Sequence, residues 1–154
     1  MAKPESSLRS AYYWVVVADE FQAHFYTRES KSGLMVQQET LQNESARQKL
    51  GDLISDRGGR SFDSLGSGRH AYDEEKSNAK THSYAVFAKK IAERVRAGHQ
   101  NQKFVKLAII AAPRFLGVLR NALDKAGIEA DLTINKEVTG HDTAFIQKLM
   151  DEHY

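Results

Sequence analysis

The stretch Phe104-Val-Lys-Leu-Ala-Ile-Ile-Ala-Ala-Pro-Arg-Phe-Leu-Gly-Val-Leu-Arg120 decides the fold class of this chain. Its first part, up to Ala111, is a run of mainly aliphatic residues that predicts a strand buried on both faces. Pro113 follows, and proline suits the first turn of a helix, where its missing N–H costs nothing. An apolar stripe then predicts a helix that ends at Gly127, and alternating residues over 130–138 predict another strand. Because a strand-helix-strand unit joins parallel strands, the chain is predicted to be α/β.

The N-terminal part of the chain indicates an antiparallel section of the same sheet. Short runs of β-branched and aromatic residues are separated by turn-forming residues, which is the pattern of a β-meander. The three strands are predicted at residues 12–18, 22–28 and 34–41.

Two further helices complete the predicted architecture. Apolar residues recur on one helical face over 80–97, and Gly98 is a natural stop. Asp142 or Thr143 can cap a last helix, and Gly117 is interpreted as a close approach of its helix to the sheet. The predicted order is β-β-β, loop, α-β-α-β-α. This is one α/β domain over 12–154, a mixed β-sheet with helices on its faces, preceded by a flexible N-terminus over 1–11.

The composition limits the classes of function. Hydrophobic residues make up 41% and charged residues 27% of the chain, and the formal charge is +2, as in ordinary soluble globular proteins. The lack of cysteine excludes disulfides and zinc–thiolate sites. The apolar runs are too short to span a bilayer, and the polar start does not resemble a secretory signal. A cytoplasmic protein without membrane insertion is therefore predicted, and, because the six histidines lack ligand spacing, no metal or cofactor.

The segment over 51–79 lacks apolar periodicity and predicts a long glycine- and arginine-rich loop. Glycine lets a backbone approach a ligand closely, and the planar fork of arginine suits phosphate or carboxylate. The candidate anion- or RNA-binding residues of this loop are Arg57, Gly58, Gly59, Arg60, Arg69 and His70. The alternative is an ordered surface loop whose arginines pair internally with Asp56, Asp63 or Asp73.

A basic cluster follows on the predicted helix and just beyond it. Its residues, opposed only by Glu93, are Lys89, Lys90, Arg94, Arg96, Lys103 and Lys106. Lys90 and Arg94 are four residues apart and are predicted to be adjacent on the outer helix face, where they could bind RNA phosphates. A solvated helix face without a ligand is the alternative interpretation.

Two other positions carry charge at predicted strand ends. Arg114 opens a helix after a buried strand, where anions are favoured, so it is a further binding candidate, although an ordinary turn between strand and helix explains it too. Asp19 and Glu20 follow the first strand. Nucleases that use two metal ions need several clustered carboxylates, and turn chemistry is the better explanation of Asp19.

Four motifs together resemble a bacterial family described as "protein required for attachment to host cells". They are Tyr13-Trp-Val-Val-Val-Ala-Asp19, Ser55-Asp-Arg-Gly-Gly-Arg-Ser-Phe-Asp63, Gly68-Arg-His70 and Ala111-Ala-Pro-Arg-Phe-Leu-Gly-Val-Leu-Arg120. The resemblance covers about residues 12–149. That family is similar in turn to the middle domain of the class-one release factor of eukaryotes and archaea, and to Pelota. The resemblance implies a ribonuclease-H-like sheet with an exposed glycine loop.

In release factors that loop carries Gly-Gly-Gln and enters the peptidyl-transferase centre of the ribosome. The corresponding residues here are Gly58-Gly59-Arg60, and a cationic arginine does not replace a neutral amide that orients water. The resemblance therefore favours a non-enzymatic protein that binds ribosomal or other RNA, with no catalytic residue assigned. Two alternatives remain: an attachment factor with a protein or host-surface partner, and a hydrolase of esters such as peptidyl-tRNA.

Overall fold

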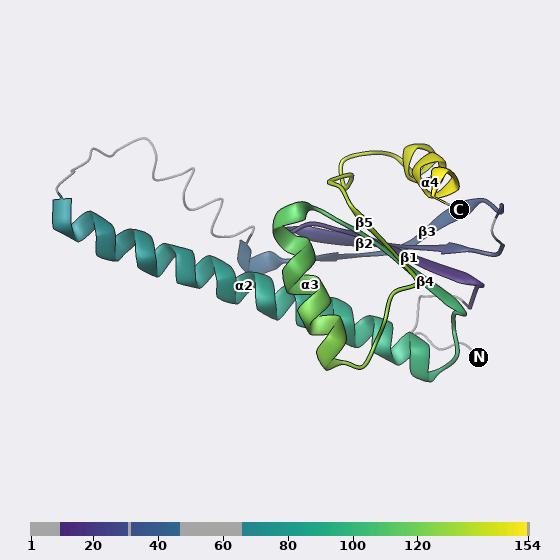
Figure 1. Cartoon of the computed structure of the whole chain (residues 1–154), viewed down its shortest axis with the longest axis horizontal. Coiled ribbons are helices and arrows are strands. Elements are labelled where there is room, and N and C mark those ends of the chain that lie inside the picture. Colours follow the sequence, from purple (N-terminus) through teal and green to yellow (C-terminus); the bar gives the residue numbers. More distant parts are fainter. Residues whose placement is uncertain (1–9, 31, 47–65, 154) are drawn as a thin grey trace.

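The computed structural model describes residues 10–30, 32–46 and 66–153, with side chains described from residue 80 onward in the last range. Every strand and long helix that the sequence predicts is present, in the predicted order (Figure 1). The elements are β1 (Tyr13–Ala18), β2 (Gln22–Arg28), β3 (Met35–Gln42), α2 (Gly66–Gln100), β4 (Lys106–Ala111), α3 (Pro113–Lys125), β5 (Leu132–Asn135) and α4 (Thr143–Glu152).

The strands form one five-stranded mixed sheet in the order β3-β2-β1-β4-β5. β1 pairs antiparallel with β2, and β2 with β3, which confirms the predicted meander. β4 lies parallel to β1 on its other side, and β5 lies parallel to β4. β1 is thus the centre of the sheet, and all six of its residues are buried. The mixed α/β architecture is confirmed.

Helices cover both faces of the sheet (Figure 1). α2 and α3 pack on one face, where Phe87, Ile91 and Phe115 join Trp14 and its same-face neighbours in a core. α4 covers the other face through a second core that includes Ile146, Leu149 and Met150. No helix in the described part of the chain is long and apolar enough to cross a membrane.

The length of α2 is the main departure from prediction. The sequence predicted a helix from residue 80 and a loop over 51–79, but α2 begins at Gly66, so residues 66–79 are helical. The N-terminal half of α2 extends past the sheet (Figure 1). A helix segment that does not lie over the sheet needs no apolar stripe toward it, so the periodicity that marks a sheet-packed helix is missing there. The rest of the predicted loop, 51–65, lies outside the described residues.

Two glycines have other roles than predicted. Gly98 does not end α2, which continues to Gln100. A Cβ at Gly98 would overlap the six-membered ring of Trp14, so the glycine is needed because α2 crosses directly over this buried indole. Gly117 was interpreted as a close approach of α3 to the sheet, but a Cβ there would meet nothing within 4 Å. That interpretation is wrong, because Gly117 is on the exposed side of α3.

Candidate functional site

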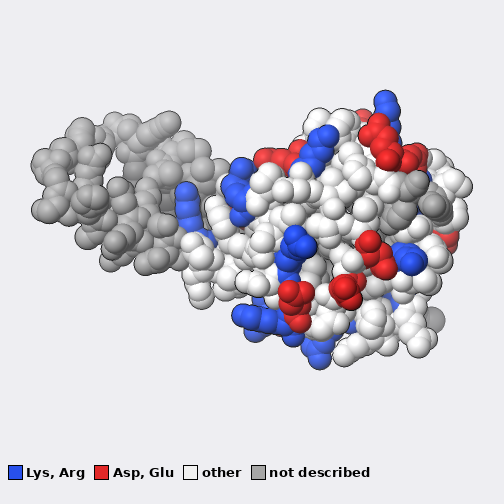
Figure 2. Space-filling view, in the orientation of Figure 1, with Lys and Arg blue, Asp and Glu red and all other residues white. Residues whose placement is uncertain are grey.

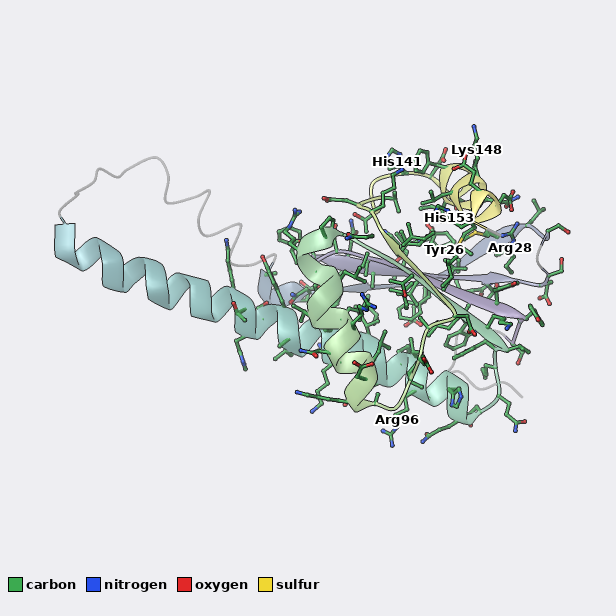
Figure 3. The ribbon with its side chains drawn as sticks, viewed as in Figure 1. Tyr26, Arg28, Arg96, His141, Lys148 and His153 are labelled. Carbon is green, nitrogen blue, oxygen red and sulfur yellow. The ribbon has the colours of Figure 1, made fainter. Side chains whose placement is uncertain are left out.

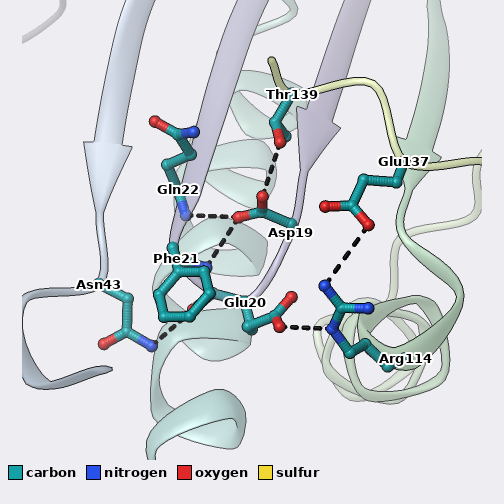
Figure 4. A network of polar contacts seen from close by, with 8 residues as sticks. All are labelled: Asp19, Glu20, Phe21, Gln22, Asn43, Arg114, Glu137 and Thr139. Atoms are coloured by element: carbon teal, nitrogen blue, oxygen red, sulfur yellow. Dashed lines mark hydrogen bonds and ion pairs between the residues drawn. The ribbon is translucent and has the colours of Figure 1, made fainter. Parts of the chain in front are cut away.

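Asp19 closes the turn between β1 and β2 (Figure 4). One of its carboxylate oxygens accepts hydrogen bonds from the backbone N–H groups of Phe21 (2.8 Å) and Gln22 (2.9 Å). The other accepts from the Thr139 hydroxyl at 2.6 Å, which joins the turn to the segment after β5. Asp19 is 5% exposed. Its oxygens are engaged by three donors, as the turn chemistry of the sequence predicts.

Glu20 and Arg114 form an ion pair beside this turn, at the N-terminus of α3 (Figure 4). Arg114 Nε donates to the Glu20 carboxylate, which raises the pKa of the arginine. A second guanidinium nitrogen lies 3.4 Å from Glu137. Two carboxylates thus contact this one cation. Because the Arg114 guanidinium already contacts Glu20 and Glu137, its surroundings favour the turn interpretation, and anion binding at Arg114 stays a prediction.

Tyr84 on α2 belongs to the same neighbourhood. Its ring packs edge-on to Phe115 of α3, with centroids 6.5 Å apart. Partial burial raises the pKa of its hydroxyl, the charge of Glu20 raises this pKa further, and Arg114 lowers it. The carboxyl ends of β1 and β4 therefore carry a cluster of polar groups that interact mostly with one another. Within the described residues, no three His, Asp or Glu side chains are placed to hold a metal ion.

Replacing Arg114 with alanine is expected to destabilise the domain by about 2 kcal/mol, because it leaves the nearly buried Glu20 carboxylate without its cation. Arg114 itself is 56% exposed, so the loss is smaller than for a fully buried pair. Urea unfolding of R114A, E20Q and the double variant measures this. The double variant should be more stable than R114A, because the unpaired charge is gone; additive losses would contradict the coupling.

The fold places most members of the predicted basic cluster at different sites on the molecule. Arg94 points to the sheet edge, where its guanidinium makes a two-pronged contact with Glu39 of β3. Arg94 is still one helical turn from Lys90, but its guanidinium is paired with Glu39. Lys106 lies at the start of β4, 3.8 Å from Asp131. Lys90 is exposed and lines a hollow next to the start of the segment after β3.

Two cluster members, Lys89 and Arg96, instead line a second feature, which we call the helix groove. It is a hollow of about 580 Å³ between the outer sides of α2 and α3. Lys125 of α3 adds a third cation to it. Arg96 projects from the lower edge of the molecule, on the side opposite α4 (Figure 3). None of these three cations makes an ion pair with another described residue, so they are available to a ligand.

Charged side chains are unevenly distributed over the surface of the molecule. Lys and Arg mark the side of the body from which α2 emerges, while both signs are mixed elsewhere on the same face (Figure 2). Of the predicted loop residues, Arg69 and His70 are on the projecting part of α2, and their side chains are not among those described. Arg57, Gly58, Gly59 and Arg60 lie outside the described residues, so their binding role stays a prediction.

Sequence reasoning missed Lys125, Glu39 and Glu137. Lys125 is three residues after Ala122 on the same helix face, so a helical wheel of α3 could have placed it beside the groove. No local signal pairs Glu39 with Arg94, or Glu137 with Arg114. Those contacts join segments far apart in the sequence and require the strand order to be known.

A family model described as "Protein required for attachment to host cells" matches residues 14–149, from β1 into α4. The match includes Asp19, Glu20 and Arg114 and the residues that line the helix groove. No curated protein matches the chain. Since the family model spans most of the chain, the chain belongs to the family of proteins required for attachment to host cells.

Proposed function

We propose that this chain is a non-enzymatic binding protein that contacts RNA phosphates through the start of α2 and the segment before it. The observation that carries the proposal is the projection of α2 past the sheet (Figure 1). At about 1.5 Å per residue, a helix of 35 residues is roughly 50 Å long. Among the α2 residues whose side chains are described, from residue 80 onward, the first buried apolar one is Phe87. The part that carries Arg69 and His70 is therefore presented away from the body, as suits a probe that enters a larger particle.

The same geometry is compatible with a release-factor-like role. The strand order β3-β2-β1-β4-β5, with an antiparallel meander followed by two parallel strands, supports the proposal of a ribonuclease-H-like sheet of the release-factor middle-domain type. The position of Gly58-Gly59-Arg60 just ahead of α2 in the sequence supports the comparison with the release-factor loop. The partner would then be the ribosome, and the place of action the cytoplasm. Lys90, exposed on α2, would extend such a contact toward the body.

RNA binding is tested by fluorescence anisotropy with a labelled structured RNA over a salt series. We expect affinity to fall with salt, and the variant R57A/R60A/R69A to reduce the log–log slope by about 2 to 3. The matched control R120A/K136A/K148A removes the same charge from exposed positions elsewhere and should leave the slope nearly unchanged. Equal slopes for both triple variants would reject a specific role of the segment 57–70.

The family description favours a second candidate, a role in attachment to host cells. In that case a deletion strain should adhere poorly, and purified protein added outside the cells should restore adhesion. Restoration only by expression inside the cells would indicate an indirect role. The hydrolase alternative predicts release of peptide from stalled ribosomes by purified protein, and loss of that release on substitution of Gly59.

A further inference from the structure

The helix groove has the shape of a channel. Its lining residues run along α2 from Thr81 to Arg96 and along α3 from Val118 to Lys125 and its C-cap Ala126, at spacings of three and four residues. Each helix thus contributes one continuous stripe. The stripe on α2 covers about four turns, or roughly 22 Å. A channel of this length fits a rod-shaped ligand along its whole extent, which a compact small molecule would not fill.

The floor of the groove is aliphatic and its rim is basic. Small side chains in the floor let another backbone approach closely; the floor residues are Ala85, Val86, Ala92, Val118, Ala122 and Ala126. The rim carries Lys89, Arg96 and Lys125, with Glu93 as the opposing charge. An apolar floor between positive edges is complementary to a helix with one apolar face and acidic flanks.

We propose that the helix groove binds an acidic amphipathic helix of a partner protein. The floor would receive its apolar face, and the three rim cations would meet its acidic flanks. Single-stranded RNA fits less well, because no Phe, Tyr or Trp is among the described lining residues on which bases could stack. Lys90, the described cation of the proposed RNA contact, is not among the residues that line the groove.

The test is a titration of the full chain, followed by backbone NMR, with three peptides of about 15 residues, roughly the length of the groove. One peptide has a leucine stripe with glutamate flanks, the second has the same stripe with lysine flanks, and the third is a scrambled glutamate peptide. We expect the glutamate helix to bind about tenfold more tightly than either other peptide. Its shifts should be confined to residues 81–96 of α2 and to residues 118–126, the end of α3 and its C-cap.

Matched variants distinguish binding in the helix groove from a general effect of the protein's charge on peptide binding. The variant K89E/K125E should abolish or reverse the preference for the glutamate helix. The control K90E/R120E makes the same charge change once on each helix, at exposed positions outside the groove, and should keep the preference.

Equal binding of the three peptides, or equal effects of the two double variants, would overturn the proposal. So would a dimer in sedimentation analysis that K89E/K125E dissociates, because a second copy would then occupy the groove. RNA binding by R57A/R60A/R69A is measured in a separate experiment, and its outcome does not depend on whether the groove binds the peptide.

Discussion

Replacing Gly98 with alanine should destabilise the domain by about 3 kcal/mol, because the added methyl group would occupy space held by the Trp14 indole. Trp14 is 2% exposed and packs against Phe104, with ring centroids 4.9 Å apart. It therefore has little freedom to move aside. Either α2 must shift away from β1 or the indole must leave its place in the core. Urea unfolding at 25 °C, followed by circular dichroism, measures the loss.

Gly117 on α3 provides the matched control. It is also a helical glycine, but a Cβ there meets nothing within 4 Å. G117A should therefore stabilise the domain by about 0.5 to 1 kcal/mol, the usual gain from alanine over glycine inside a helix. The double variant W14F/G98A should recover part of the loss seen in G98A, because phenylalanine lacks the outer ring. A G98A variant as stable as the unsubstituted protein would contradict the close crossing of α2 over Trp14.

Replacing Asp19 with alanine should also cost about 3 kcal/mol. It removes the acceptor of two backbone N–H groups and of the Thr139 hydroxyl, in a place that water barely reaches. D19N should cost only about 1 kcal/mol, because its amide oxygen can still accept the backbone N–H groups and Thr139 can rotate to become an acceptor.

Thr139 offers an independent control for this network. T139V keeps the shape of the side chain and removes only the hydroxyl, so its cost should be about 1 kcal/mol, near that of D19N. Chemical denaturation of the three variants tests the order of these losses. A D19A variant no less stable than D19N would show that Asp19 does not hold the turn.

The fold was predictable where burial imposes a pattern. The aliphatic run of β4 and the apolar residues of β2 follow from burial in the sheet. The proline at the start of α3 follows instead from the free N–H positions of a first helical turn. The start of α2 was not predictable in this way, because residues 66–79 extend past the sheet and carry no apolar stripe. Gly98 was misinterpreted because its reason is a single tertiary contact with Trp14, which no local pattern encodes.

The candidate site was predictable only in part. Lys89 and Arg96 were identified from the sequence as cations of α2. Their association with Lys125 was not predicted, because it depends on how α2 and α3 lie together. Arg94 and Arg114 were selected because they are arginines at suitable positions. Their carboxylate partners, Glu39 and Glu20, are 55 and 94 residues away in sequence. Charge patterns in a sequence identify possible ligand contacts, but only the fold decides which cations are already paired.

Ribosome co-sedimentation tests the central claim most directly. Lysates containing the unsubstituted protein, R57A/R60A/R69A or the charge-matched control R120A/K136A/K148A are centrifuged at low and moderate salt. We expect the unsubstituted protein and the control to pellet with ribosomes at low salt and to be released as salt rises, whereas R57A/R60A/R69A should stay in the supernatant at both salt concentrations. Absence of the unsubstituted protein from the ribosome pellet at low salt, or equal pelleting of all three proteins, would contradict it.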